Sequence, residues 1–203
     1  MAEFMTYSLT RYKSYQEYLD DAELSHECNY RLLSTGELIE VAAGDDDNLM
    51  IATVLGFFIT QLNNGIYKKR VRTGKKELQV PPVGDKQVNR KPDLIVLQPE
   101  HRESARQAVK FGMRPPLFVA EIVSPGAESS INYQRDYVWK RQQYEWWQIP
   151  EYWIIDPHRN RITVLVLTEG VYQETVYASD ERVVSTVFPD MALITRDVLN
   201  GDL

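Results

Sequence analysis

The sequence predicts a mixed α/β (α+β) domain in which a mixed β-sheet is flanked by helices and extended by β-hairpins. Three observations predict this class. Short apolar segments bounded by Pro and Gly recur along the chain, two long segments carry apolar residues at helical spacing, and two pairs of strands are joined by tight turns. With 203 residues, 43% hydrophobic and 26% charged, the chain fits one domain spanning residues 1–203.

The first third predicts a helix, a hairpin and a longer helix. Residues 14–24 predict a short helix, with Ser14 and Glu17 placed as a capping box. Strands near 30–34 and 37–42 form a hairpin around Thr35-Gly36. A helix from about 44 to 63 begins at three aspartates, 45–47, and buries one face. These aspartates could also ligate a metal, but helix capping is the favoured interpretation.

The middle of the chain predicts mostly short strands. Weak strands near 66–71 and 77–80 precede a loop at 81–85, and a short apolar strand covers 93–97. Residues 100–112 are polar and predict a surface helix or loop. Residues 117–123 are nearly all apolar, lie between two proline-containing turns, and predict a buried strand.

The last third predicts a long helix followed by strands. The helix covers about 131–148, and Ile149-Pro150 ends it before a buried strand at 151–157. A hairpin follows at 161–167 and 171–177, with a turn at Glu169-Gly170. A strand near 183–187 and a helix near 195–199 complete a sheet of about seven to nine strands.

The numbers of cysteines and histidines limit which metal sites and disulfides the chain can form. One cysteine, Cys28, excludes an intrachain disulfide and a cysteine metal cluster, and it favours a reducing compartment. The three histidines form no ligand-spaced motif. No signal-peptide pattern and no long apolar run are present, so we expect a cytoplasmic protein with no membrane partner.

Charge is unevenly distributed. The net charge of −6 argues against indiscriminate nucleic-acid binding, but residues 68–114 hold 13 Lys and Arg against 5 Asp and Glu. This segment can guide a polyanion to one face, although ordinary solvated lysines explain any single residue equally well. The candidate nucleic-acid contacts are Lys68, Lys69, Arg70, Arg72, Lys75 and Lys76.

One acidic residue interrupts the buried strand at 117–123. Alternation places Glu121 on one face with Leu117, Val119 and Val123. A buried carboxylate must be paired, protonated or bound to a cation. Pairing with an Arg or Lys across the sheet is one interpretation. A cation site is the other, because Asp93 begins the preceding core strand, and two carboxylates from neighbouring strands can hold Mg²⁺.

The following helix adds two further groups. Asp136, Lys140 and Tyr144 recur every four residues and share one helix face. A plain Asp136–Lys140 salt bridge is the simplest interpretation, whereas a lysine beside a metal-bound water can also assist phosphodiester hydrolysis.

Five segments in this order resemble the Uma-two family of endonucleases, a branch of the restriction-endonuclease-like PD-(D/E)XK nuclease superfamily. They are GELIE at 36–40, PDLIVL at 92–97, EIVSP at 121–125, the trio Asp136, Lys140 and Tyr144, and EYWIIDP at 151–157. The resemblance runs from about Tyr7 to Leu199. It implies a restriction-endonuclease-like core and a Mg²⁺- or Mn²⁺-dependent endonuclease that cleaves nucleic acid, with DNA favoured.

The resemblance also implies residue roles. Asp93, Glu121 and the backbone carbonyl of Ile122 would bind the metal. Val123 stands where the superfamily usually has lysine, so Lys140 becomes the catalytic candidate, assisted by Asp136. For Tyr144, packing is favoured over chemistry. Glu40 could complete the site, although an exposed hairpin position is slightly favoured.

Two departures from the family pattern support a second hypothesis. Arg31 follows Tyr30 where the family often has Glu, and Asn48 occupies the position of a frequent His. A catalytically inactive nuclease-fold module that binds nucleic acid or protein is therefore the alternative.

Three physical expectations follow. Asp93 and Glu121 should converge, with Lys140 nearby, and at least one carboxyl group should have a raised pKa without metal. The aromatic-rich stretch also predicts exposed rings at a two-fold interface, hence a homodimer, unless all its rings pack beneath the sheet. Its residues are Trp139, Trp146, Trp147, Tyr152 and Trp153.

Overall fold

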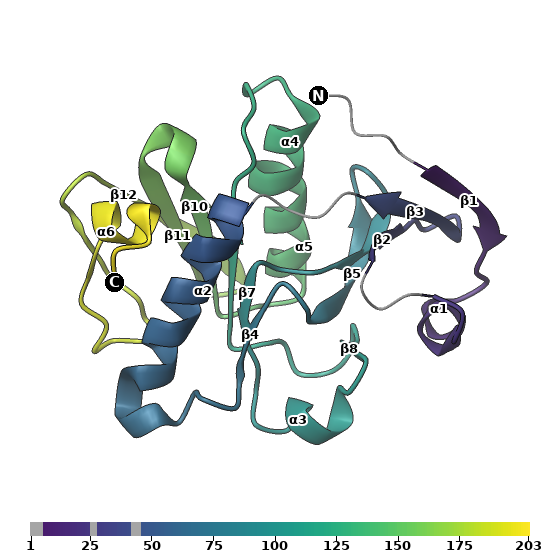
Figure 1. Ribbon diagram of the computed structural model, residues 1–203, viewed down its shortest axis with the longest axis horizontal. Coiled ribbons are helices and arrows are strands. Elements are labelled where there is room, and N and C mark those ends of the chain that lie inside the picture. Colours follow the sequence, from purple (N-terminus) through teal and green to yellow (C-terminus); the bar gives the residue numbers. More distant parts are fainter. Residues whose placement is uncertain (1–5, 25–27, 42–45) are drawn as a thin grey trace.

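The computed structural model describes residues 6–24, 28–41 and 46–203. Its centre is a six-stranded sheet with the strand order β12-β11-β10-β9-β7-β4 (Figure 1). Strands β9 and β10 are parallel, and the other neighbouring pairs are antiparallel. The strands are β4 Val71–Thr73, β7 Leu94–Val96, β9 Phe118–Ile122, β10 Glu151–Asp156, β11 Arg161–Thr168 and β12 Val171–Ala178.

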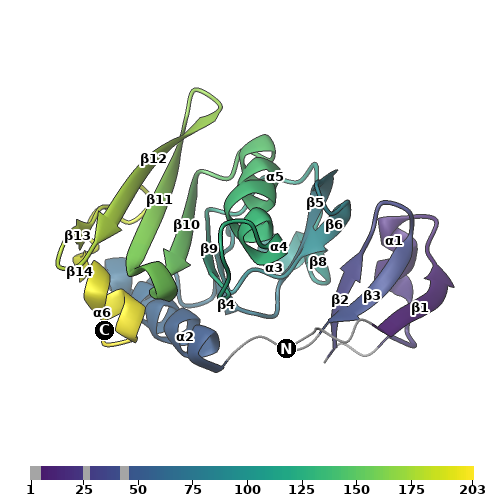
Figure 2. The same ribbon diagram turned by 90° about the horizontal axis from the view of Figure 1, so that it is seen from above.

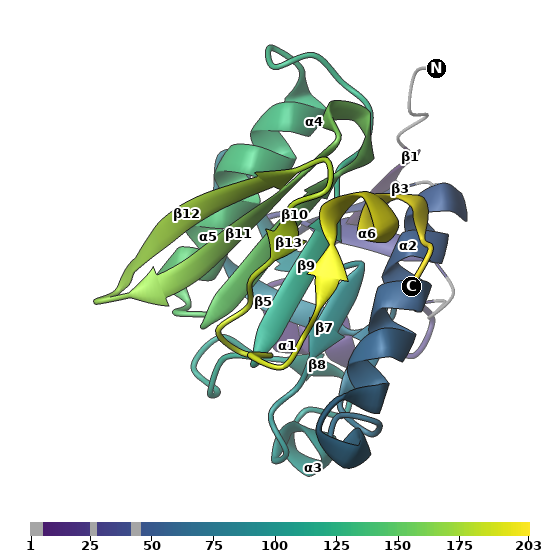
Figure 3. The same ribbon diagram turned by 90° about the vertical axis from the view of Figure 1, so that its left-hand side faces the viewer.

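The sheet separates two hydrophobic cores. All five residues of β9 are buried, and their alternation places Phe118, Ala120 and Ile122 in one core and Val119 in the other. The first core is covered by α2, Asp46–Gln61, and α6, Thr195–Asn200. The second lies against the helical run around α5, Lys140–Trp146. Figure 3 shows α2 and α6 on one side of the sheet and α4 and α5 on the other.

The long helix α2 packs through a stripe of apolar residues. Ile51, Leu55 and Ile59 are buried at four-residue spacing, and Gly56 lies where a Cβ atom would crowd Leu94 and Val71. A 3₁₀ turn, η1 Leu62–Gly65, follows, in which Asn63 and Asn64 adopt left-handed backbone conformations. The chain then turns into β4.

The second helical run has three parts: α4 Ile131–Tyr133, the π-helical segment η2 Gln134–Trp139, and α5. Ser130 caps its N-terminus by accepting a hydrogen bond from the Tyr133 amide. The sequence predicts one α-helix here, and the π-helical segment is a difference with consequences for the site.

Two smaller sheets lie on the α5 side of the central sheet, and one of them separates the other from α5 (Figure 2). Strands β1 Thr6–Arg11, β2 Asn29–Leu32 and β3 Glu37–Val41 form one sheet, with α1 Tyr15–Asp20 beside it (Figure 2). The capping box is confirmed, because the Glu17 amide donates to Ser14 and Glu17 accepts from the Lys13 amide. The other sheet contains β5 Glu77–Val83, β6 Gln87–Arg90 and β8 Ala108–Val109.

Short elements complete the fold. They are α3 His101–Ser104, η3 Pro157–Arg159, and the pair β13 Arg182–Val183 and β14 Leu193–Ile194. Among the described residues, no helix is long and apolar enough to cross a membrane.

Several expected boundaries are wrong. Residues 66–70 form turns and only 71–73 form a strand, while Pro81–Val83 belongs to β5 rather than to a loop. β1, β6, β8 and β14 were not expected, and the strand expected near 183–187 is reduced to Arg182–Val183. The strands also divide among four sheets instead of one. Of the three aspartates expected at the head of α2, Asp45 lies outside the described residues, and Asp46 and Asp47 form the first turn.

Candidate active site

Strand register places Asp93 and Glu121 side by side. Leu94 of β7 pairs with Ala120 of β9, so Asp93, one residue earlier, lies opposite Glu121 on the antiparallel neighbour. Opposed residues of such a pair point to the same face, and that face carries α5. Both carboxylates therefore lie beneath the helix that carries Lys140.

Asp93 is partly buried where its strand begins. Its Oδ2 accepts a hydrogen bond of 2.7 Å from the Ile122 amide, and its own carbonyl accepts one of 3.0 Å from Gly74. Burial, and then the neighbouring Glu121, raise the pKa of Asp93 to about 7, whereas Lys140 lowers it. The expected raised carboxyl pKa is confirmed at this residue.

Glu121 is buried and holds two donors. Lys140 Nζ lies 2.8 Å from Oε2, and the Tyr144 hydroxyl donates to Oε1 at 2.5 Å. Burial and the Glu121 charge raise the pKa of Tyr144, which stays protonated as a donor. Tyr144 is therefore both packed and polar, although the sequence favoured packing alone.

The π-helical segment aligns Asp136 with Lys140. Their side chains form a 2.7 Å ion pair, and Arg135 adds a second cation 3.1 Å from Asp136. Residues four apart are neighbours on a helix face, and π-helical turns often occur at functional sites. Burial opposes the charge on both groups, but the mutual attraction lowers the pKa of Asp136 and raises that of Lys140.

The donor set suits a hard divalent cation. Asp93 and Glu121 face each other, and burial together with the Glu121 charge raises the pKa of Asp93. The Ile122 carbonyl accepts a 3.5 Å contact from the Asn48 side-chain amide. Across the described residues, no group of three or more His, Cys, Asp or Glu side chains could hold a metal. Mg²⁺ fits a site of two carboxylates because it keeps several waters.

Other buried carboxylates are fully engaged by protein donors. Glu151 accepts from Trp153 Nε1, the Ser185 and Thr186 hydroxyls and two backbone amides. Asp156 accepts from Tyr137 and from the Arg159 amide and side chain. These two residues fix the ends of β10, and their oxygens are not offered to a ligand.

Of two further residues that the sequence analysis singled out, Asn48 lies next to the acid pair and Glu40 lies in another sheet. Asn48, at the position of the frequent family His, reaches the Ile122 carbonyl and so borders the acid pair. Glu40 is exposed on β3 in the separate N-terminal sheet. Within the part of the chain that the structure describes, no hydrogen bond or ion pair joins Glu40 to the acid pair.

The basic segment divides into exposed and engaged residues. Lys68, Lys69, Arg72 and Lys75 are exposed. Arg70 donates to the Leu97 carbonyl at 2.6 Å, and its guanidinium stacks on Tyr67. Lys76 is buried, and its ammonium donates to the carbonyls of residues 105–107. A phosphate would therefore have to compete for Lys76.

The aromatic stretch is largely buried. Trp147, Tyr152 and Trp153 are core residues, and Trp139 is partly buried, whereas 62% of Trp146 is exposed. Trp146 forms an edge contact with Phe111, which is 43% exposed. The expectation of exposed rings is met at Trp146 alone among these residues.

Some residues near the site carried no sequence signal. Arg135, next to Asp136, is buried, and no sequence pattern distinguishes it from a surface cation. Arg90 is likewise buried and donates to Gln143, one residue before Tyr144 on α5. An arginine at a strand end gives no periodic pattern that would reveal this contact.

A mixed sheet with helices on both faces, and an acid pair on two adjacent central strands beneath a lysine-bearing helix, define a protein of the restriction-endonuclease-like class. The family model described as "Uma2: Putative restriction endonuclease" matches residues 15–196, and the chain belongs to this family. The suspected family is thereby confirmed.

A solved structure shares the fold. A crystal structure described as "a putative nuclease belonging to DUF820 from Anabaena variabilis ATCC 29413" aligns with a TM-score of 0.59. The alignment covers 93% of this chain and 98% of that chain at 18% sequence identity, so the likeness shows the fold alone. The comparison with curated proteins finds no match.

Proposed function

We propose that this protein is a metal-dependent endonuclease that hydrolyses phosphodiester bonds of nucleic acid. Membership of a family described as restriction endonucleases supports nuclease-like function. Metal-dependent cleavage is supported by one observation: Asp93 and Glu121 lie opposite each other on adjacent strands, and Lys140 from the helix above pairs with Glu121. A structural ion pair between Lys140 and Glu121 does not by itself require a second carboxylate, Asp93, opposite Glu121 on the neighbouring strand.

In this proposal, Asp93, Glu121 and the Ile122 carbonyl hold Mg²⁺ or Mn²⁺. The bound metal would supply an activated water and neutralise charge on the scissile phosphate. Tyr144 orients Glu121 through its hydroxyl, and the Ile122 amide orients Asp93. Asp136 holds the Lys140 ammonium beside the acid pair, where it can stabilise negative charge that develops during cleavage.

The test is cleavage of single- and double-stranded DNA and of RNA, with and without Mg²⁺ or Mn²⁺. We expect metal-dependent cleavage by the wild-type protein, with DNA preferred, and none by Asp93→Ala. Cleavage of equal rate by Asp93→Ala would contradict the proposed site. Absence of cleavage by the wild-type protein on every substrate would favour the alternative below.

The alternative is an inactive nuclease-fold module that binds nucleic acid or protein. Asn48 favours the inactive module, because its side-chain amide contacts the Ile122 carbonyl at a position where the family often has His. The ion pair between Lys140 and Glu121 also satisfies the acid without a metal. Stable binding of DNA without cleavage in either metal would support this function.

Two finer expectations belong to the proposal. A homodimer is supported by the exposed edge of Trp146 and Phe111, because symmetric pairs cut two strands most directly. A cytoplasmic location is supported by the single cysteine.

A further inference from the structure

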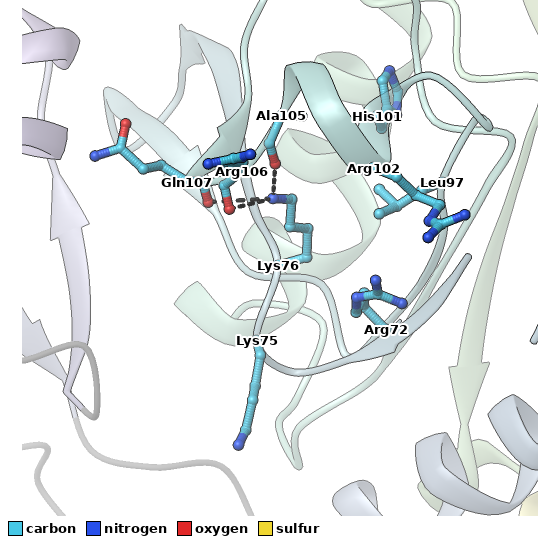
Figure 4. A pocket seen from close by; sticks show the side chains of 9 residues that line it. All are labelled: Arg72, Lys75, Lys76, Leu97, His101, Arg102, Ala105, Arg106 and Gln107. Atoms are coloured by element: carbon cyan, nitrogen blue, oxygen red, sulfur yellow. Dashed lines mark hydrogen bonds between the residues drawn. The ribbon is translucent and has the colours of Figure 1, made fainter. Parts of the chain in front are cut away.

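A basic pocket of about 430 Å³ lies at the edge of the central sheet (Figure 4). Arg72 of β4, Lys75 from the following turn, Arg102 of α3 and Arg106 from the loop after α3 contribute to its lining. Among the described residues that line it, none is acidic. The pocket thus gathers cations from two separate segments of the chain.

No carboxylate among the described residues that line this pocket neutralises its Lys and Arg side chains. Lys76 also lines it, but Figure 4 shows the Lys76 ammonium directed at the carbonyls of residues 105–107. Arg102, Arg106 and Lys75 are exposed, and Arg72 uses one guanidinium nitrogen on the Lys69 and Val71 carbonyls. Cations brought together repel, and an anion between them removes that repulsion. This concentration stands out on a chain with a net charge of −6.

The pocket opens on the same face of the sheet as the acid pair. Arg72 pairs with Ile95, and Ile95 pairs with Val119, so these three residues lie on the same face of the sheet, which is the face that carries α5. Asp93 and Glu121 occupy the parallel row two residues further along. Two strand spacings and two residues separate Arg72 from Glu121, about 12 Å between Cα atoms. This distance is several times the roughly 3.4 Å rise per nucleotide along the axis of duplex DNA, so a phosphate in the pocket and the acid pair would lie at different nucleotides.

We propose that the pocket binds a phosphate group of a nucleic-acid substrate, a few nucleotides from the bond that is cleaved. The inference rests on the proposed function for its substrate class and adds two residues, Arg102 and Arg106, that the basic stretch around β4 does not contain. Arginine suits this role because its planar fork matches phosphate oxygens. The pocket thereby fixes the distance between a held phosphate and the acid pair.

Binding without cleavage tests the pocket. The probe is a short labelled DNA duplex, titrated with EDTA present at several salt concentrations. We expect Arg102→Gln/Arg106→Gln to weaken binding about tenfold. The slope of log affinity against log salt should fall by about 0.9 for each phosphate that the variant no longer neutralises. Arg182→Gln/Arg196→Gln is the matched control, because it removes two exposed arginines beside the opposite face of the sheet.

The outcomes separate the pocket from general electrostatics. The control should keep its affinity and slope, and Arg102→Lys/Arg106→Lys should recover most of the affinity. Equal losses in both glutamine variants, or no loss in the pocket variant, would overturn the inference. Failure of the wild-type protein to bind the duplex would overturn it as well.

A second comparison identifies the source of the phosphate. If the pocket takes a terminal phosphate, 5′-phosphorylation of the probe strengthens wild-type binding and has no effect on the pocket variant. If it takes a backbone phosphate, phosphorylation has no effect and the variant loses affinity for both probes. Because no metal is present, these results are independent of cleavage. A wild-type protein that cleaves while its pocket variant binds normally would refute the pocket and leave the proposed function intact.

Discussion

Asp93 is the carboxyl group of the candidate site whose pKa is raised furthest into the neutral range. Its pKa near 7 means that the metal-free protein holds a proton there through much of the acidic range. A divalent cation would replace that proton and relieve the repulsion from Glu121. The same group therefore links stability, pH and metal binding.

The first prediction concerns stability against pH in EDTA. Asp93 binds its proton more tightly in the folded protein than in the unfolded chain, so ionising it opposes folding. The stability that protonated Asp93 contributes to the folded state is fully present below about pH 4 and is lost as pH rises through 7. Between pH 5 and 8 the free energy of unfolding should fall by roughly 2–3 kcal/mol more in the wild-type protein than in Asp93→Asn. Urea denaturation at both pH values measures this.

The comparison with Asp93→Asn isolates this residue, because burial also raises the pKa of Glu77 in both proteins. Equal pH dependence of the two proteins would show that Asp93 is ionised in the folded state at all these pH values.

The second prediction separates binding from catalysis at Lys140. Lys140→Ala should abolish cleavage and leave DNA affinity nearly unchanged, because its role is confined to the transition state. It should also lower stability by about 3 kcal/mol, since Glu121 and Asp136 lose a shared cation. Cleavage must therefore be measured below the melting temperature.

Arg141→Ala is the matched control for Lys140→Ala. Arg141 is the next residue of the helix and its ion pair with Glu174 is exposed, so its loss should change stability little. Normal cleavage by folded Lys140→Ala would remove the lysine from the mechanism.

Residues on regular elements could be placed from the sequence. Alternation placed Glu121 on one face of its strand, and helical spacing placed Lys140 and Tyr144 on one helix face. The structure brings these two faces together. The same patterns could not place Arg135 or Lys76, whose burial depends on contacts between distant segments. Local patterns contain no information about such contacts.

At the scale of elements, irregular segments position the site. The π-helical segment η2 carries Asp136 one turn before Lys140, and Trp139 at its end packs against the β5–β6 turn at Gly84. β5 itself contains Pro81 and Pro82, which signal a loop in sequence. The register of β5 with β6 shifts between Gln79 and Val83, and this irregularity accommodates the prolines.

The third prediction tests the contact between Gly84 and η2. Gly84 has φ +54°, and a Cβ atom there would overlap the Trp139 indole ring. Gly84→Ala should lower the free energy of unfolding by about 3 kcal/mol, from strain plus displacement of Trp139. Gly74→Ala has a similar φ of +59° with no atom within 4 Å, so about 1 kcal/mol is expected. Equal effects in urea denaturation would show that the Trp139 contact does not hold the helix in place.

At the scale of the whole molecule, the fold class and the buried central strands could be predicted, whereas the partition into separate sheets could not. β5, β6 and β8 are short or interrupted by proline, and only long-range pairing decides which strands they join. The charge asymmetry was visible in the sequence, but the pocket needed α3 to fold over β4.

The fourth prediction concerns assembly. Light scattering should detect a homodimer, and Trp146→Ser should shift it toward monomer by removing the exposed ring beside Phe111. Phe57→Ser is the control, because Phe57 is also exposed but lies on α2 across the sheet. A monomeric wild-type protein at high concentration would refute the dimer and leave the site chemistry untouched.

The central claim is that Asp93 and Glu121 form a cation site. Calorimetric titration with Mn²⁺ tests it most directly, in the wild-type protein, in Asp93→Asn and Glu121→Gln, and in Glu40→Gln as an exposed control. We predict specific Mn²⁺ binding by the wild-type protein and Glu40→Gln, a rise in melting temperature with Mn²⁺ for both, and loss of both effects in the other two variants. Undiminished Mn²⁺ binding by Asp93→Asn and Glu121→Gln, or no binding by the wild-type protein, would contradict the claim.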